Sequence, residues 1–190
     1  SASSSLVETF CRQHGLANAS ADLRARYLGD CETAKDYNKC RKWHSEFCNI
    51  TPQWRKALET SELVGKHHFP PTQHNQDMLH DLKKVIILRD PYEIIKAYHR
   101  GDVTGVFPIQ STDFCFRFSE RAWLRRAEST GLVQQLQTFY EGWLHHPGET
   151  CIIHYEQVIN APQETLNTIE AYFDLPVTQD IELVREKYTR

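Results

Sequence analysis

The sequence predicts an α/β fold with a mainly parallel sheet. Two short apolar runs, Val85–Leu88 and Cys151–His154, alternate with longer segments whose apolar residues recur at helical spacing. The first run is apolar throughout, which is typical of a strand buried on both faces of a parallel sheet. Residues 1–190 are expected to form one domain, because a chain of this length can bury a substantial core.

Residues 1–60 are expected to contain one helix and then an irregular region that carries cysteines. The apolar spacing from Leu6 predicts a helix that ends near Gly15, after a small polar start. Residues 18–60 are polar, and we expect irregular structure with short helices and three local anchors, namely Trp43, Phe47 and Trp54.

Residues 61–190 are expected to form the core of the domain. A short strand is predicted at 63–66, because two prolines follow it and stop it. Asp90 and Pro91 are a good helix cap and a good first helical residue, so a helix is predicted to begin there. Its apolar stripe would be Ile94, Ile95 and Tyr98, and further helices are predicted at 114–128, 132–145 and 162–174.

Composition excludes two classes of protein. The net charge is −3, whereas proteins that bind nucleic acid usually carry a basic excess, so no nucleic-acid partner is expected. Apolar residues make up 40% of the chain, but no apolar run approaches the roughly 18 residues that cross a bilayer. No membrane span is expected.

The cysteines and two sequons indicate the secretory pathway. There are six cysteines, and an even number fits disulfide bonds in an oxidising compartment, although the sequence allows many pairings. Asn18 and Asn49 each begin an Asn-x-Ser/Thr tripeptide in a polar, turn-like segment, so both are predicted glycosylation sites. We therefore expect a secreted or lumenal glycoprotein, in a mature or trimmed form because no signal peptide is visible.

Arg89 is the first candidate for a binding residue. It follows the strand 85–88 directly and precedes a predicted helix N-terminus. Open α/β sheets bind ligands at the carboxyl ends of their strands, and an arginine there can hold a phosphate with paired hydrogen bonds. The alternative is that Arg89 and Asp90 only pair with each other and cap the helix.

Three segments resemble sulfotransferases that use 3′-phosphoadenosine-5′-phosphosulfate. The segment 84–99 resembles the part of these enzymes that binds the 3′-phosphate, where a strand ends in Arg-Asp/Asn-Pro. His-Tyr-Glu-Gln-Val at 154–158, followed by 162–176, resembles the Tyr-Glu-Asp-Leu segment and the helix after it. The segment 66–70 resembles the Lys-Thr-His-x-Pro strand end. The Arg-Asp-Pro-Tyr and His-Tyr-Glu-Gln variants are most similar to sulfotransferases that accompany WSC domains.

The resemblance implies a three-layer P-loop-type fold and roles for three residues. His68 would take the proton from the acceptor hydroxyl, and Lys66 would stabilise charge near the transferred sulfuryl group. Arg89 would hold the 3′-phosphate. Ala97 stands where the family usually has a serine, so one hydroxyl contact to that phosphate would be missing.

One family feature does not occur in the sequence. Sulfotransferases begin their sheet with a strand and a Pro-Lys-Ser-Gly-Thr-Thr-like loop that cradles the 5′-phosphosulfate, and no such loop is present here. The helix from Leu6 to His14 resembles the family's first helix, so Ser1–Ser5 would match the last residues of the loop. The strand and most of the loop would then precede Ser1, and the open strand edges would need cover from other chains in a homo- or hetero-oligomer.

Two functions follow as expectations. The first is a pseudoenzyme, a domain that serves in binding, storage or assembly and has no cofactor of its own. The second is an active carbohydrate sulfotransferase that transfers sulfate from 3′-phosphoadenosine-5′-phosphosulfate to a glycan hydroxyl. In the second case a separate polypeptide would supply the P-loop strand.

Two further patterns have simpler explanations. Cys40, His44 and Cys48, with the histidine pairs 67–68 and 145–146, could bind a metal, but disulfides explain the cysteines better and no metal site is expected. A set of aromatic residues could line an apolar pocket, but at helical spacing such residues more often form the core. The set is Phe114, Phe116, Phe118, Trp123, Phe139, Tyr140 and Trp143.

Overall fold

The computed structural model has the predicted mixture of helices and strands. It describes residues 2–18, 49–59, 63–66, 69–100, 119–146 and 148–179. In chain order the elements are α1 (Ala2–His14), β1 (Ala17–Asn18), α4 (Pro52–Glu59), β2 (Leu63–Val64), α5 (Gln73–Leu79), β3 (Lys84–Leu88), α6 (Pro91–Arg100), α7 (Glu120–Ser129), α8 (Leu132–Leu144), β4 (Thr150–His154), α9 (Tyr155–Asn160) and α10 (Pro162–Tyr172). Within these ranges, no helix combines the length and the hydrophobicity needed to cross a membrane.

The strands form two parallel pairs, β1 with β2 and β3 with β4. The prediction of a parallel sheet is therefore confirmed. The prediction that Val85–Leu88 is buried on both faces is wrong, because every residue of β3 is only partly buried. The described part of the chain gives β3 a strand neighbour on one edge alone, so fewer side chains cover it.

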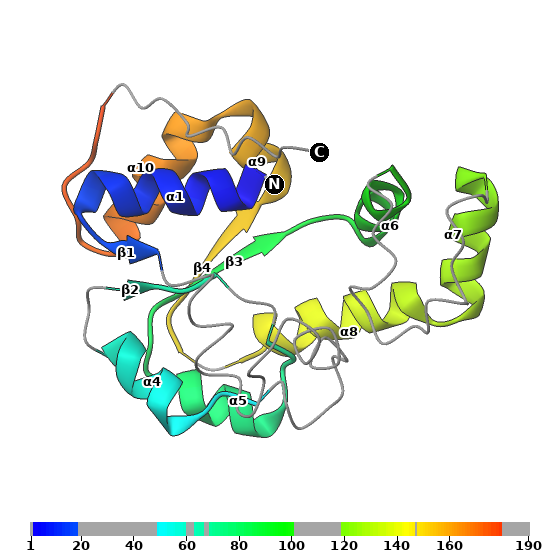
Figure 1. Ribbon diagram of the computed structural model, residues 1–190, viewed down its shortest axis with the longest axis horizontal. Coiled ribbons are helices and arrows are strands. Elements are labelled where there is room, and N and C mark those ends of the chain that lie inside the picture. Colours follow the sequence, from blue (N-terminus) through cyan, green and yellow to red (C-terminus); the bar gives the residue numbers. More distant parts are fainter. Residues whose placement is uncertain are drawn as a thin grey trace.

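Helices cover both faces of the strands, and this produces three layers (Figure 1). On one face, Leu6 and Phe10 of α1 pack with buried residues of β4, α9 and α10, and with the partly buried Val64 of β2 and Val85 and Ile87 of β3. On the other face, Ile86 of β3 packs against a cluster from α4, α5, α8 and the adjoining turns. Its buried members are Ile50, Trp54, Phe69, Leu79 and Trp143.

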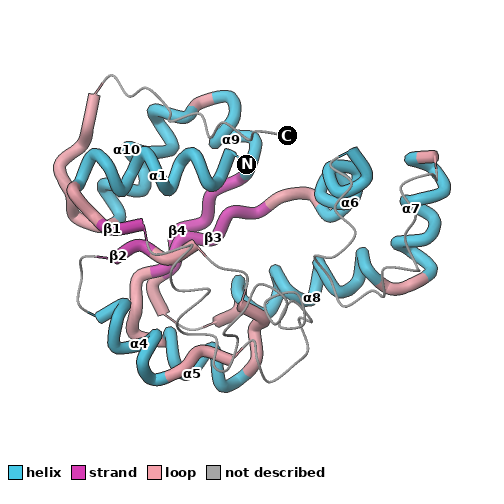
Figure 2. The backbone as a smooth tube through the Cα atoms, in the orientation of Figure 1, coloured by secondary structure: helices cyan, strands magenta, loops and turns pink. Residues whose placement is uncertain are grey.

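A third cluster holds α6, α7 and α8 together. Figure 2 shows these helices extending away from the strands. Ile95 of α6 and Trp123 of α7 are buried, and the indole Nε1 of Trp123 donates a hydrogen bond of 3.1 Å to the Ile95 carbonyl oxygen. Trp123 and Trp143 are core residues, as predicted, and Phe139 and Tyr140 are partly buried against the clusters. Phe114, Phe116 and Phe118 lie outside the described residues.

Several elements differ from the prediction. Helix α1 begins at Ala2, so residues 2–5 form its first turn and not the end of a loop. Strand β2 is shorter than expected, and the helices α5 and α9 were not predicted. Helix α5 depends on its cap, since the Thr72 side chain accepts a hydrogen bond from the Asn75 amide. A helix of two turns has too few residues for its apolar period to be recognised.

Candidate functional site

The carboxyl ends of the strands and the N-terminus of α1 meet at one edge of the domain. Lys66 follows β2 by two residues, and its Nζ donates a hydrogen bond of 2.7 Å to Ser4 Oγ in the first turn of α1. Helix α9 begins directly after β4 and packs against α1. Figure 1 shows the N-terminus beside α9. Both strand pairs therefore end at the same edge, which we call the carboxyl edge.

Arg89 lies at the carboxyl edge, and no described residue forms an ion pair or a hydrogen bond with its guanidinium group. It is the first residue after β3, and its Cζ lies 4.2 Å from the ring centroid of Tyr155. Its Nε is buried without a hydrogen-bond partner, and among the described residues the guanidinium makes no ion pair. A cation stacked on an aromatic face is held in place by the ring while its N–H groups stay free for a ligand.

Asp90 explains why Arg89 stays free. The Asp90 Oδ1 accepts hydrogen bonds from the backbone amides of Tyr92 (2.8 Å) and Glu93 (3.0 Å), so it caps α6 as predicted. The described residues show no ion pair between Arg89 and Asp90, so the alternative interpretation holds only for the helix cap. Because Asp90 already occupies two amides of the first turn of α6, an anion at this turn would depend on the guanidinium.

Two tyrosines complete the surroundings of Arg89. Burial raises the pKa of Tyr140 on α8, and the nearby backbone N–H and charge of Arg89 lower it in part. Tyr155 of α9 supplies the ring under the guanidinium. Neither tyrosine was predicted as a site residue. The register of β3 and β4 would have indicated Tyr155. Leu88 pairs with His154, so the residues that follow them, Arg89 and Tyr155, are also neighbours.

Lys66 adds a second positive charge at the same edge. The first turn of α1 contains no acidic residue, and the N-terminus of a helix carries a partial positive charge. The partly buried ammonium of Lys66 lies against this turn. Cations at a helix N-terminus are not stabilised by the helix dipole, so the arrangement favours an anion nearby.

The remaining predicted site residues are placed as follows. His68 lies outside the described residues. Ala97 is a partly buried residue of α6. Asn18 is exposed at the end of β1, where its Nδ2 donates to Glu8 Oε2 at 2.8 Å and lowers the pKa of Glu8, and Asn49 is partly buried. Glycosylation of either asparagine stays a prediction.

The cysteines divide into two groups. Cys11 and Cys151 are free thiols, and burial raises the pKa of Cys11 to about 11 and also raises that of Cys151. Cys31, Cys40, Cys48 and Cys115 lie outside the described residues, so the disulfides stay a prediction. In the described ranges no three metal-ligating side chains come together, and the pattern of Cys40, His44 and Cys48 lies outside them.

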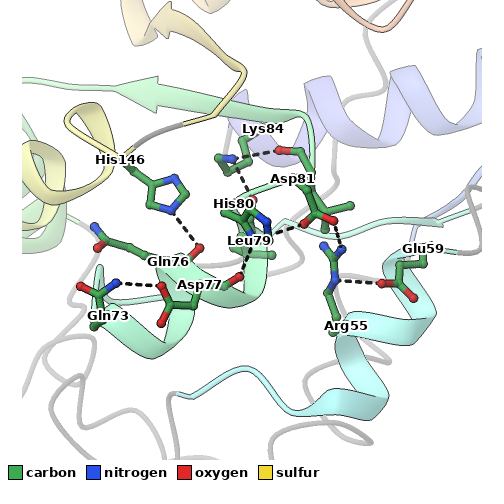
Figure 3. A network of polar contacts seen from close by, with 11 residues as sticks. Arg55, Glu59, Gln73, Gln76, Asp77, Leu79, His80, Asp81, Lys84 and His146 are labelled. Atoms are coloured by element: carbon green, nitrogen blue, oxygen red, sulfur yellow. Dashed lines mark hydrogen bonds and ion pairs between the residues drawn. The ribbon is translucent and has the colours of Figure 1, made fainter.

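A polar network occupies the opposite, amino end of β3 (Figure 3). Lys84 Nζ donates hydrogen bonds of 2.9 Å to the carbonyl oxygens of Leu79, the last residue of α5, and Leu82, in the turn between α5 and β3. Arg55 of α4 binds Asp81 at 2.7 Å and Glu59 at 3.0 Å. Burial lowers the pKa of Lys84. Every cation of this network is therefore engaged by the fold itself.

Comparisons of the chain with known protein families, with characterised proteins and with solved structures give no match. The case for a function therefore depends on the carboxyl edge. Of the three residues that the resemblance implicates, Lys66 and Arg89 lie at this edge. An edge with two cations, two tyrosines and a helix N-terminus can bind an anion and orient it.

Proposed function

We propose that this chain is a sulfotransferase-like domain of the secretory pathway that binds a phosphate-bearing ligand at Arg89. Its role is binding, storage or assembly with other chains, and not catalysis by this chain alone. One observation carries the proposal: a guanidinium that is stacked on Tyr155, without an ion pair in the described chain, at the carboxyl end of a parallel strand.

The geometry around Arg89 suits a phosphate monoester. A planar guanidinium can donate two parallel hydrogen bonds to two phosphate oxygens, and a charge-assisted bond of this kind contributes roughly 1.5–3 kcal/mol. Tyr155 restricts the guanidinium to one plane, which lowers the entropy lost on binding. The 3′-phosphate of adenosine 3′,5′-bisphosphate is the ligand group that this proposal assigns to Arg89.

The strand edges support the proposal that other chains take part. In the described chain β2 pairs only with β1, and β3 pairs only with β4. Val64 of β2 and Val85 of β3 belong to the same cluster under α1, so both pairs lie in one layer. Unpaired strand edges attract further strands. We propose that a strand from another polypeptide, or from an oligomeric partner, covers these edges.

Lys66 favours a second candidate function, an active carbohydrate sulfotransferase. In this candidate the glycan hydroxyl oxygen forms a bond to sulfur, the bond between sulfur and the donor phosphate breaks, and adenosine 3′,5′-bisphosphate leaves. Lys66 would stabilise the charge on the bridging oxygen and His68 would take the hydroxyl proton. The position of Lys66 at the carboxyl edge, near the N-terminus of α1, is compatible with this role.

Isothermal titration calorimetry with adenosine 3′,5′-bisphosphate tests the proposal. We expect binding by the wild type, and Arg89→Gln is expected to weaken it by about ten- to a hundredfold, because one charge-assisted pair is lost. Arg89→Lys should recover only part of the loss, since an ammonium cannot donate in the same plane. Arg125→Gln is the control, because Arg125 is exposed on α7.

The outcomes separate the candidates. No binding by the wild type, or an equal loss in the Arg89 and Arg125 variants, would reject the proposed site. A sulfate-transfer assay with 3′-phosphoadenosine-5′-phosphosulfate and a glycan acceptor then decides between binding and catalysis, provided that the protein is purified together with any polypeptide that supplies the P-loop strand. Turnover that requires Lys66 and His68 would establish the second candidate, and binding without turnover would support the first.

A further inference from the structure

We propose that Glu170 and His14 form an acid-sensitive latch that holds the segment 174–179 against α10 and α1. Glu170 lies on α10, and His14 is the last residue of α1. The His14 Nε2 is 2.9 Å from Glu170 Oε1, and their side chains are 9% and 0% exposed. The other carboxylate oxygen, Oε2, accepts a hydrogen bond of 2.9 Å from the backbone amide of Thr178.

The segment is attached to α10 through Thr178 on both sides of its backbone. While the Thr178 amide binds Glu170, the Thr178 carbonyl oxygen accepts a hydrogen bond of 2.6 Å from Gln163 Nε2. Leu175 donates its amide to the Glu170 backbone carbonyl at 2.9 Å and packs against the cluster under α1. From its place on α10, the Glu170 side chain thus bonds both to the segment and to α1.

A carboxylate can satisfy both donors, whereas a carboxylic acid cannot. The ionised group presents two acceptor oxygens, one for the imidazole and one for the Thr178 amide. Protonation of either oxygen places an O–H where an N–H already points, so one of the two bonds is lost. A doubly protonated imidazole offers only donors and cannot accept the new proton. The latch holds with His14 in either charge state, as a hydrogen bond or as an ion pair.

The direction of the pH effect follows from Glu170. Burial would raise its pKa, but the hydrogen bonds from Thr178 and His14 outweigh burial and lower it. A carboxyl group whose pKa is lowered on folding stabilises the folded state above the unfolded value of 4.5 and loses this contribution as the pH falls through the folded value. The latch therefore stays closed at neutral pH and opens below about pH 4.5.

Other charged groups on the neighbouring elements are engaged elsewhere or exposed. Among the described residues, His14 supplies the charge that lowers the pKa of Glu170. Cys151 of β4 is a free thiol, and the other groups are Glu8 with Arg12 at 2.9 Å on α1, Asp174 with Lys83 at 2.6 Å, and the exposed Glu156 of α9 and Glu164 of α10.

Amide hydrogen exchange measured by NMR tests the latch. We expect the protection factor of the Thr178 amide, corrected for intrinsic exchange, to fall by up to about tenfold between pH 7 and pH 3.5, because one carboxyl group changes the opening constant by at most a factor of about ten for each pH unit below 4.5. The amide of the buried Leu166, in the same helix as Glu170, should stay protected. Glu170→Met removes the titration and offers no acceptor to the Thr178 amide, so it should leave Thr178 unprotected already at pH 7. Glu164→Gln, at an exposed site on α10, should behave as the wild type.

Three results would overturn the proposal. They are unchanged protection of Thr178 down to pH 3.5, loss of protection at Thr178 and Leu166 at the same pH, and normal protection of Thr178 in Glu170→Met. If Glu170→Met does not fold, the titration of the wild-type protein alone still decides, because it compares two amides within one folded molecule.

Discussion

Each end of β3 carries a cation, and the two cations differ in their interactions with the rest of the fold. Lys84, at the amino end, donates to the carbonyl oxygens of Leu79 and Leu82 and is part of a network that includes α4 and α5 (Figure 3). Arg89, at the carboxyl end, stacks on Tyr155 and has no hydrogen bond or ion pair through its guanidinium in the described chain. At one end of the strand the cation is hydrogen-bonded to backbone carbonyl groups, and at the other end the cation has no such partner in the described chain.

The difference separates a structural cation, Lys84, from Arg89, the cation that we propose binds a ligand. The carbonyl groups at the end of a helix lack partners within the helix, and a partly buried ammonium there can bond to them and interact favourably with the helix dipole. An arginine held only by an aromatic ring satisfies no group of the fold, so the fold gains little from its charge. Stability and ligand affinity should therefore respond to the two residues in opposite ways.

The largest expected effect is on stability at the amino end. Lys84→Met keeps most of the side-chain stem, but it leaves the Leu82 carbonyl oxygen without the ammonium and the Leu79 carbonyl oxygen with only the Leu82 amide at 3.2 Å as a donor. The loss of two charge-assisted hydrogen bonds is expected to lower the free energy of unfolding by about 2 kcal/mol, a value reduced for the partial exposure of the ammonium. Arg89→Met should cost less than about 1 kcal/mol, because only a stacking interaction is lost. Urea unfolding followed by fluorescence measures both values.

Lys96→Met controls for the loss of a lysine charge. Lys96 forms a surface ion pair of 2.8 Å with Glu93, one helical turn away, and its removal should leave stability nearly unchanged. If Arg89→Met destabilised the protein more than Lys84→Met, the division into a structural and a binding cation would be wrong.

A smaller effect is expected on ligand affinity when Tyr155 is changed. Tyr155→Leu removes the ring that restricts the guanidinium of Arg89, and we expect adenosine 3′,5′-bisphosphate to bind about three- to fivefold more weakly, which corresponds to the worth of one exposed cation–π contact. Tyr155→Phe retains the ring and should bind as the wild type does. Calorimetric titration of the two variants gives the ratio, and equal affinities would show that the ring does not position Arg89.

The sequence predicts features that depend on neighbouring residues better than contacts that form only in the packed fold. The strand 85–88, the helix after Asp90 and Pro91, and the location of Arg89 at a strand end all depend on neighbouring residues, and the structure has them. The partners of Lys84 are only five and two residues away, but they were not predicted, because helix α5 and the turn that follows it were not predicted. Glu170 and His14 are 156 residues apart, so only the packed fold brings them together.

The smallest effect concerns pH at the amino end of β3. His146 is buried, and its Nε2 donates a hydrogen bond of 2.8 Å to the Gln76 carbonyl oxygen, so its Nδ1 is an acceptor without a partner. Burial lowers the pKa of His146 below its ordinary value of 6.5. The unfolded chain then binds a proton more readily than the folded chain, and stability must fall as the pH decreases below 6.5.

His146→Gln keeps an N–H donor for Gln76 but cannot titrate, so its melting temperature should fall less than that of the wild type between pH 7.5 and pH 5.5. His145→Gln, which changes the exposed histidine beside it, should retain the wild-type decrease. This range lies above the pH at which the Glu170 latch opens, so the two effects are measured separately. An equal decrease in the wild type and in His146→Gln would assign the acid sensitivity to another group and would leave the amino end of β3 without a pH-dependent role.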